Sequence, residues 1–295
     1  MIVTGQYADL AGGIRLHYAT AGTRGRPLVL CLHGFPEYWA AWDDVLPELG
    51  SWAFAVAPDL RGFNLSSQPL AVEAYRTREI VGDLVGLIDA LGYERAFVLA
   101  HDWGGAAAWQ LAIAQPQRVQ KLAIVNSPHP LPFARALASN AQQQQASAYM
   151  NWLRQPDAER RLAENGFARL LGFFADEDGR LPAWLTPERI AAYRQVWARG
   201  LTGGLNYYRA TPLHPPTADT PGAAALQLDA RALRVGVPTL VIWGLRDRAL
   251  LPCLLEGLEE VVASLRLLTV PEATHWIAHE RPQWLAAEVT AFFRE

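Results

Sequence analysis

The chain has 295 residues, of which 51% are hydrophobic, 10% aromatic and 19% charged, and its formal net charge is -3. This composition is too apolar for a disordered protein. Because 26 basic residues are nearly balanced by 29 acidic ones, no excess of positive charge indicates a nucleic-acid-binding protein.

Short apolar runs alternate with longer amphipathic runs over the first part of the chain. The alternation predicts strands at 27–33, 53–57, 95–100 and 119–125, and helices at 39–49, 73–91 and 104–114. An alternation of this kind is typical of a parallel sheet that is covered by helices on both faces.

The pattern changes after residue 127. Residues 128–216 contain no convincing buried strand and are helical in composition, interrupted by Pro and Gly and rich in aromatic residues. Strand–helix alternation then resumes, with strands expected at 238–243 and 265–270 and helices near 252–263 and at 281–294. We therefore predict one α/β core, residues 1–127 and 217–295, interrupted by a helical cap at 128–216.

Cysteine use and apolar runs bear on the cellular location. The two cysteines, Cys31 and Cys253, suggest neither a disulfide framework nor a zinc site. The first residues lack the basic region and apolar stretch of a signal peptide, and no apolar run reaches the roughly 18 residues that cross a bilayer. We expect a cytoplasmic protein that needs no metal or organic cofactor and binds no membrane.

The sharpest motif is the strand-to-helix turn Ala100-His-Asp102-Trp-Gly104. Small residues stand two positions before and two positions after Asp102, which is the spacing of a nucleophile elbow, where a tight turn lifts one side chain above the sheet edge. An Asp before two glycines is alternatively a helix cap. The choice depends on whether catalytic partners exist elsewhere in the chain.

Two such partners follow in the expected order. Asp247 comes after the strand predicted at 238–243, and His275 comes after the one at 265–270. Because the carboxyl ends of parallel strands share one edge of the sheet, these loops can converge on Asp102 as a catalytic triad. Asp247 is alternatively a helix cap and His275 a surface residue, while His279 is the runner-up base. Backbone amides of Phe35 and Trp103 are expected to form an oxyanion hole.

Over nearly its whole length the sequence resembles the epoxide hydrolases of the α/β-hydrolase superfamily. The segments that carry the resemblance are His33-Gly-Phe-Pro-Glu37, Asp59-Leu-Arg-Gly62, His101-Asp-Trp-Gly-Gly105, Asn126-Ser-Pro-His129, Gly200–Arg209, Trp243-Gly-Leu-Arg-Asp247 and Thr274-His-Trp276. The resemblance implies an α/β-hydrolase fold with a mostly parallel, eight-stranded sheet, a lid over the active site and a cis proline after Phe35.

The resemblance also assigns roles in the lid. Family members grip the epoxide oxygen with two lid tyrosines, and the matching positions here are Tyr149 and Tyr208. Tryptophans beside the catalytic loops and in the lid are expected to form an apolar pocket. The expected substrate-binding residues are Phe35, Pro36, Trp39, Trp103, Trp152 and Trp276.

The residue types suit a two-step hydrolysis. A carboxylate, with a reference pKa of about 3.9, is ionised at neutral pH and can attack a saturated carbon without a base, while tyrosine hydroxyls can protonate the leaving oxygen. His275, oriented by Asp247, would then activate water to hydrolyse the Asp102 ester, so that activity falls on the acid side of the pKa of His275. The expected partners are a small apolar epoxide and water, for a chain that is a monomer or a homodimer.

Other functions remain open at this point. A haloalkane dehalogenase uses the same Asp nucleophile, but it usually carries an Asn where this chain has Phe35, and fluoroacetate-type enzymes carry an Arg where it has Trp103. An esterase is disfavoured because Asp102 replaces the usual serine. A non-catalytic ligand-binding protein of the same fold would tolerate the loss of a triad residue, and none is missing.

Overall fold

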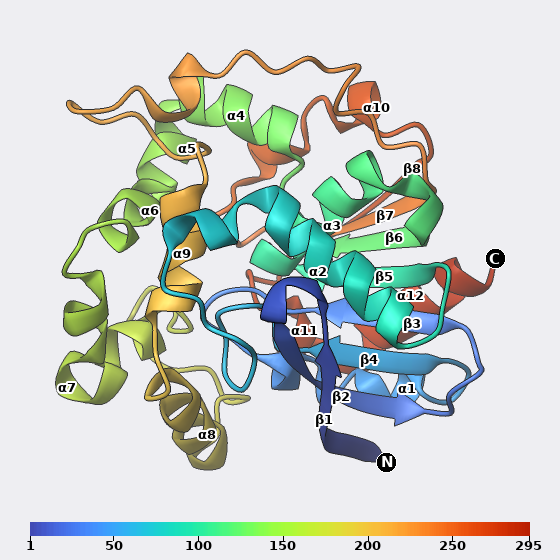
Figure 1. Ribbon diagram of the computed structural model, residues 1–295. Coiled ribbons are helices and arrows are strands. Elements are labelled where there is room, and N and C mark those ends of the chain that lie inside the picture. Colours follow the sequence, from blue (N-terminus) through green and yellow to red (C-terminus); the bar gives the residue numbers. More distant parts are fainter.

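An eight-stranded sheet forms the centre of the computed structural model, which describes residues 1–295 (Figure 1). The strand order across the sheet is β1-β2-β4-β3-β5-β6-β7-β8. The strands are β1 (Ile2–Asp9), β2 (Arg15–Gly22), β3 (Leu28–Leu32), β4 (Phe54–Pro58), β5 (Ala96–His101), β6 (Val119–Val125), β7 (Thr239–Gly244) and β8 (Leu265–Val270).

All strands from β4 to β8 across the sheet are parallel to one another, and β2 pairs antiparallel with both β1 and β4. The register aligns Cys31 of β3 with Leu99 of β5, and His101 at the end of β5 with Val125 of β6. The carboxyl ends of β3, β5, β6, β7 and β8 therefore lie along one edge of the sheet, and the loops that follow them meet there.

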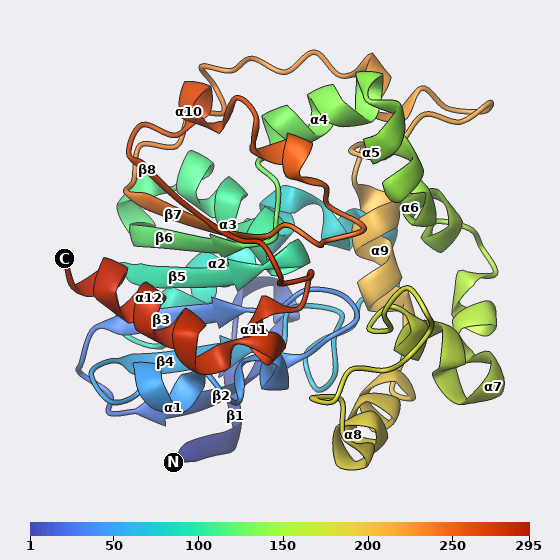
Figure 2. The same ribbon diagram turned by 180° about the vertical axis from the view of Figure 1, so that it is seen from behind.

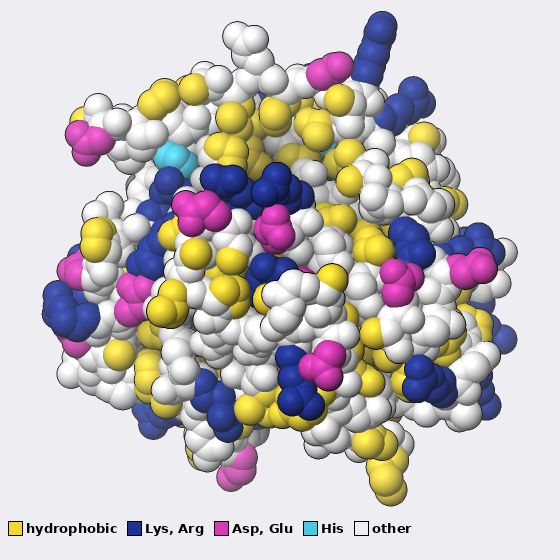
Figure 3. All heavy atoms as spheres, in the orientation of Figure 1, with side chains coloured by type: hydrophobic (Ala, Val, Ile, Leu, Met, Phe, Trp, Pro, Cys, Tyr) yellow, Lys and Arg dark blue, Asp and Glu magenta, His cyan; other side chains and the backbone are white.

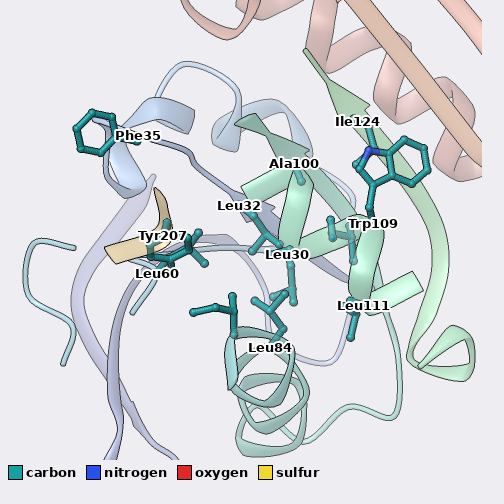
Figure 4. Close-up of a cluster of buried hydrophobic side chains, with 14 of the residues drawn as sticks. Leu30, Leu32, Phe35, Leu60, Leu84, Ala100, Trp109, Leu111, Ile124 and Tyr207 are labelled. Carbon is teal, nitrogen blue, oxygen red and sulfur yellow. The ribbon is translucent and has the colours of Figure 1, made fainter. Parts of the chain in front are cut away.

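Helices cover both faces of the sheet. Figure 1 shows α2 (Thr77–Ala90) and α3 (Asp102–Ala114) in front of it, and Figure 2 shows α1 (Leu46–Leu49) and α12 (Pro282–Arg294) on the other face. Side chains of each strand alternate between the two hydrophobic layers, so that Leu30 of β3 packs on the first face and Cys31 on the second. Figure 4 shows Leu84 of α2 beside Leu30 in the first layer.

Six helices follow one another between β6 and β7, without a strand. They are α4 (Pro130–Ser139), α5 (Ala141–Ala146), α6 (Ala148–Leu153), α7 (Ala158–Gly172), α8 (Pro187–Trp197) and α9 (Thr202–Ala210). In both ribbon views α5 to α9 gather beyond one end of the sheet, away from the two chain termini (Figures 1 and 2). Their buried aromatic residues continue the hydrophobic layer of α2 and α3. The division at residues 128 and 216 stays a prediction.

Three predicted helices are broken. The helix expected at 39–49 is a 3-10 helix, Trp39–Trp42, followed by α1, which begins at a proline-containing turn. The one expected at 73–91 is interrupted at Arg76, which has extended backbone angles. Gly257, with a φ of +78°, divides the one near 252–263 into a 3-10 helix and α10 (Leu258–Val261). The helix expected at 281–294 is confirmed as α12, and a short unpredicted helix, α11 (Ile277–Glu280), precedes it.

Strands β1 and β2 were not predicted from the sequence. Most residues of β1 are exposed, because it is an edge strand. The central residues of β2 are all buried and include the polar His17 and Thr20, which conceals any alternation of polar and apolar residues. The buried His17 is satisfied by Asp59, whose Oδ2 lies 2.6 Å from its Nδ1.

The surface shown in Figure 3 carries basic and acidic side chains interspersed with hydrophobic ones, without a continuous field of one sign. Near the top of this face, in the region of α4, hydrophobic side chains surround a hollow. None of the helices has both the length and the apolar character that crossing a membrane requires.

Candidate active site

Three loops at the carboxyl edge of the sheet bring Asp102, Asp247 and His275 together. Nδ1 of His275 lies 2.7 Å from Oδ2 of Asp247, which is hydrogen-bonding distance. Nε2 of the same ring faces Oδ2 of Asp102 at 3.8 Å. This separation is too long for a direct hydrogen bond. The imidazole therefore stands between the two carboxylates, bonded to one and facing the other.

The turn at Asp102 has the geometry of a nucleophile elbow. Asp102 has a φ of +50°, a left-handed conformation that is costly for a residue with a side chain. Its neighbours must be small, since a Cβ on Gly104 would lie 2.4 Å from the Leu32 carbonyl oxygen. A Cβ on Gly34 would lie 2.2 Å from Oδ1 of Asp102 itself. The glycines thus allow the loop after β3 to approach the carboxylate.

The two carboxylate oxygens of Asp102 have different neighbours. Oδ1 accepts a hydrogen bond from the Phe35 amide at 2.8 Å, and Oδ2 faces His275. The loop that supplies this amide contains a cis Phe35–Pro36 peptide bond, as the resemblance implied. His33 also shapes the loop, because its Nε2 accepts a hydrogen bond from the Leu60 amide at 3.0 Å. No hydrogen bond joins the Trp103 amide to the carboxylate, so its role as second donor remains a prediction.

The pKa values of His275 and Asp247 are shifted in opposite directions, because the interaction between the two groups outweighs burial. Burial lowers the pKa of His275, but the charge of Asp247, its hydrogen bond and the charge of Asp102 outweigh burial and raise that pKa to about 9. Burial raises the pKa of Asp247, but the charge and hydrogen bond of His275 and the amides of Leu250 and Ala249 outweigh it and lower that pKa. The pair therefore favours an imidazolium beside a carboxylate.

Asn126, directly after β6, supports Asp247, although the sequence did not single it out. It is buried, and its Nδ2 donates to Oδ2 of Asp247 at 2.8 Å while its Oδ1 accepts from the Gly244 amide at 2.9 Å. Its φ of +39° is left-handed, which asparagine tolerates better than most residues. An asparagine directly after a buried strand is the sequence signal that could have indicated it.

Tyr149 of α6 and Tyr208 of α9 lie above Asp102, and their rings meet edge to face with centroids 6.1 Å apart. The Tyr208 ring also packs against Phe35 and Trp103, with centroid distances of 5.4 and 5.0 Å. Burial, together with the charge of Asp102, raises the pKa of both tyrosines well above the ordinary value. Both hydroxyls therefore keep their protons at neutral pH and can donate them.

Two cavities meet at the same three residues, Asp102, Tyr149 and Tyr208. The first cavity, about 100 Å³, is lined mainly by hydrophobic side chains, among them Phe133 and Met150. The second, about 430 Å³, is more polar; His275 and Asp247 lie in its wall. A molecule that reaches Asp102 would therefore have one end in an apolar space and the other beside the triad.

The residues predicted to bind substrate divide into two groups. Phe35 and Trp276 line the larger cavity and Trp103 lines the smaller one. Pro36, Trp39 and Trp152 line neither cavity. The Pro36 carbonyl accepts a hydrogen bond from Trp197, the Trp39 amide donates to Asp59, and the Trp152 ring lies under the guanidinium of Arg161. Their proximity along the sequence to catalytic or lid segments does not place their side chains in the wall of either cavity.

The neighbouring histidines form a separate buried cluster. Oε1 of Glu37 lies 2.6 Å from Nε2 of His279 and accepts a hydrogen bond from the Tyr193 hydroxyl at 2.7 Å. Nε2 of His101 lies 2.9 Å from the His275 carbonyl oxygen. His279 thus points to Glu37 rather than to Asp102, which argues against its role as the base. No group of three or more His, Cys, Asp or Glu side chains is arranged to hold a metal ion.

Comparison with known proteins places this site in a family context. The model of the alpha/beta hydrolase fold family matches residues 27–282. The chain is 36% identical over 278 residues to the AB hydrolase superfamily protein YfhM of Bacillus subtilis, covering 92% of this chain and 91% of that protein. It is 33% identical over 317 residues to epoxide hydrolase A of Mycobacterium tuberculosis, covering 96% and 94%. The crystal structure of a Bacillus megaterium epoxide hydrolase in complex with an inhibitor superposes with a TM-score of 0.88 at 32% identity, covering 98% of this chain and 100% of that one.

Proposed function

The chain belongs to the α/β-hydrolase fold family and, within it, to the epoxide hydrolases, and we propose that it converts an epoxide and water into a vicinal diol through an ester on Asp102. The main support for the proposal is that the two cavities meet at Asp102, Tyr149 and Tyr208. A carboxylate and two protonated tyrosines line both of them, so an epoxide that enters either cavity meets a nucleophile and proton donors together.

The first step is ring opening. Oδ2 of Asp102 attacks an epoxide carbon, the carbon–oxygen bond of the ring breaks, and an ester to Asp102 forms. The departing oxygen becomes an alkoxide, which the hydroxyls of Tyr149 and Tyr208 bind, and one of them gives it a proton. The high pKa of each tyrosine keeps the proton in place until a group as basic as an alkoxide arrives. Oδ1 keeps its hydrogen bond to the Phe35 amide throughout.

The second step is ester hydrolysis. His275 takes a proton from water, and the resulting hydroxide adds to the carboxyl carbon of Asp102. Negative charge then develops on Oδ1, where the Phe35 amide already donates a hydrogen bond. When the tetrahedral intermediate collapses, the bond between Cγ and the ester oxygen breaks, the imidazolium of His275 gives its proton to the departing oxygen, and the diol leaves. The remaining proton restores the tyrosine, and Asp102 keeps one oxygen from water.

Ring opening also prepares His275 for the second step. In the free protein the charge of Asp102 helps to raise the pKa of His275 to about 9, so the imidazole is mostly protonated at neutral pH. Ester formation removes that charge. The pKa of His275 falls as a result, and the ring becomes a base when a base is first needed.

Residues 128–216 would act as the cap in this scheme, since both tyrosines belong to them. The small cavity is lined mainly by hydrophobic side chains, which suits an apolar substituent on the epoxide. The larger cavity offers space for water beside His275. We therefore propose small apolar epoxides, with an aryl or alkyl group, as substrates.

The proposal is tested by turnover with purified protein. A panel of styrene-type, terminal aliphatic and internal epoxides is incubated with the protein, and diol formation is measured by chromatography. A chloroalkane of similar size is included, with release of chloride as the readout. Diol formation without chloride release is the expected result. Chloride release without diol formation would identify a dehalogenase, and neither product, together with tight epoxide binding, would identify a binding protein.

A further inference from the structure

One arginine connects the helices that carry the two tyrosines. Arg154 follows α6, five residues after Tyr149, and is partly buried. Its Nη1 donates to the backbone carbonyls of Tyr208, Thr211 and Arg209; the last two hydrogen bonds measure 2.9 and 3.5 Å. These carbonyls lie at the carboxyl end of α9, where helix carbonyls lack partners within the helix and carry partial negative charge. The guanidinium of Arg154, at the end of α6, therefore supplies hydrogen bonds to the carbonyls at the end of α9.

Helix α9 is fastened to the α/β core by contacts of its own. The Tyr207 hydroxyl donates to the Arg61 carbonyl at 2.9 Å, and Asn206 Nδ2 donates to the Leu70 carbonyl at 3.1 Å. Gly203 packs directly on Gly62, because a Cβ added to Gly203 would lie 2.3 Å from the Cα of Gly62. These contacts fix the position of Tyr208 relative to the core.

Helix α6 makes its long-range side-chain hydrogen bonds to the chain at and just after Tyr208. Besides Arg154, Asn151 donates through Nδ2 to the Pro215 carbonyl at 3.0 Å. The position of Tyr149 therefore depends on the position of α9. The hydrogen bond from Arg154 to the carbonyl of Tyr208 is the most direct link between the two tyrosines.

We infer that Arg154 is a positioning residue for ring opening: by holding the Tyr208 carbonyl from the end of the Tyr149 helix, it sets the spacing at which both hydroxyls reach the same epoxide oxygen. The inference rests on the proposed function. Loss of this spacing weakens the binding of the alkoxide and leaves Asp102, His275 and Asp247 untouched. Ring opening then slows, whereas ester hydrolysis, which uses no tyrosine donor to activate water, keeps its rate.

The test separates the two steps. Arg154→Ala protein in excess is mixed with styrene oxide, and the Asp102 ester is followed over time by mass spectrometry of the quenched protein. We expect ester formation to slow by about 10- to 100-fold, the scale of a misplaced catalytic group, and ester decay to stay within about twofold of the unsubstituted protein. Arg160→Ala is the matched control, because Arg160 is exposed and pairs only with Asp157 and Glu164 of its own segment; both rates should be unchanged.

A second variant covers the case in which Arg154→Ala does not fold. Arg154→Gln keeps one donor for the carbonyls and is expected to slow ester formation less than Arg154→Ala, again without change in decay. Equal slowing of formation and decay would show a structural role and overturn the inference, as would unchanged formation in Arg154→Gln and Arg154→Ala. If His275→Gln protein accumulates no ester from any epoxide, the proposed function itself is rejected, and the inference with it.

Discussion

The catalytic carboxylates and the two tyrosines occupy regions built in different ways. Asp102, Asp247 and His275 follow β5, β7 and β8 of one sheet, and backbone amides hold both carboxylates directly. Tyr149 and Tyr208 come from α6 and α9, of six and nine residues, which are held by side chains that bind backbone carbonyls. The sheet edge thus provides fixed charges, and the helical segment provides proton donors whose placement depends on helix docking.

Under the proposed mechanism, the two regions serve different steps of the reaction. The tyrosines would act when the epoxide oxygen leaves, and His275 would act when water attacks the ester. Changes in one region should therefore slow one step and leave the other unchanged.

The largest expected effect follows from removal of the base. His275→Gln should lower steady-state turnover by about 10³-fold, because water loses its general base, while ring opening continues. The ester should accumulate and appear as a mass increase of the protein equal to the mass of the epoxide. The control is the Asp102→Ala, His275→Gln double variant, which should show no increase. An equal mass increase in the double variant would place the ester on another residue.

The second-largest effect is expected from substitution of the two tyrosines in the helical segment. Tyr149→Phe and Tyr208→Phe should each slow ester formation by about 10²-fold, since one donor to the alkoxide is lost. Decay of the ester should be unchanged in stopped-flow or quenched mass measurements. Tyr193→Phe serves as the control, because that buried hydroxyl binds Glu37 and not the substrate site. Slower ester decay in either Phe variant would break the separation between the regions.

The pH dependence should also differ between the steps. Ester hydrolysis requires neutral His275, so its rate should rise about tenfold per pH unit below the pKa of His275 in the ester state. That pKa should lie below the value of about 9 in the free protein, because the charge of Asp102 has been neutralised. Ring opening uses the two tyrosines, whose raised pKa keeps them protonated, so its rate should not follow the titration of His275. Hydrolysis that gains rate only above pH 9 would contradict the predicted fall in pKa.

The smallest effect is expected from the loss of Asn126, which donates a hydrogen bond to Asp247. Asn126→Ala should slow ester hydrolysis by roughly tenfold and lower the free energy of unfolding by about 1.5–3 kcal/mol, because a buried hydrogen bond to a charged group is lost. Asn64→Ala is the matched control: Asn64 also has a positive φ, of 46°, and donates to a buried aspartate, Asp59, at 2.8 Å. The control should lose similar stability, measured by denaturant unfolding, without slower hydrolysis. Equal slowing in both variants would make the effect one of general destabilisation.

The same contrast explains what could be predicted from the sequence. The parallel part of the sheet was predictable because strands such as 27–33 and 119–125 are short apolar runs, and the site residues at their ends follow from the rule that these ends share an edge. The edge strand β1 could not be recognised because it is mostly exposed. The break at Arg76 escaped prediction because an ordinary residue adopts the non-helical angles there.

The helical segment was less predictable for a physical reason. Amphipathic spacing indicates helices but does not say which aromatic side chain faces a cavity. Tyr149 and Tyr208 were identified through the family resemblance, whereas Trp152, chosen for its place in the lid, lies beside arginines away from both cavities. The hydrogen bonds of Arg154 to carbonyls near residue 208 join positions about 55 residues apart, and no local pattern reveals such a pairing.

The proposed mechanism makes Asp102 the nucleophile and has water attack its carboxyl group. It is tested most directly by a single turnover in heavy-oxygen water, with the protein in excess over styrene oxide, followed by mass spectrometry of the diol and of the peptide that contains Asp102. We expect one heavy oxygen in Asp102 and none in the diol. Heavy oxygen in the diol after that first turnover, with Asp102 unlabelled, would contradict it.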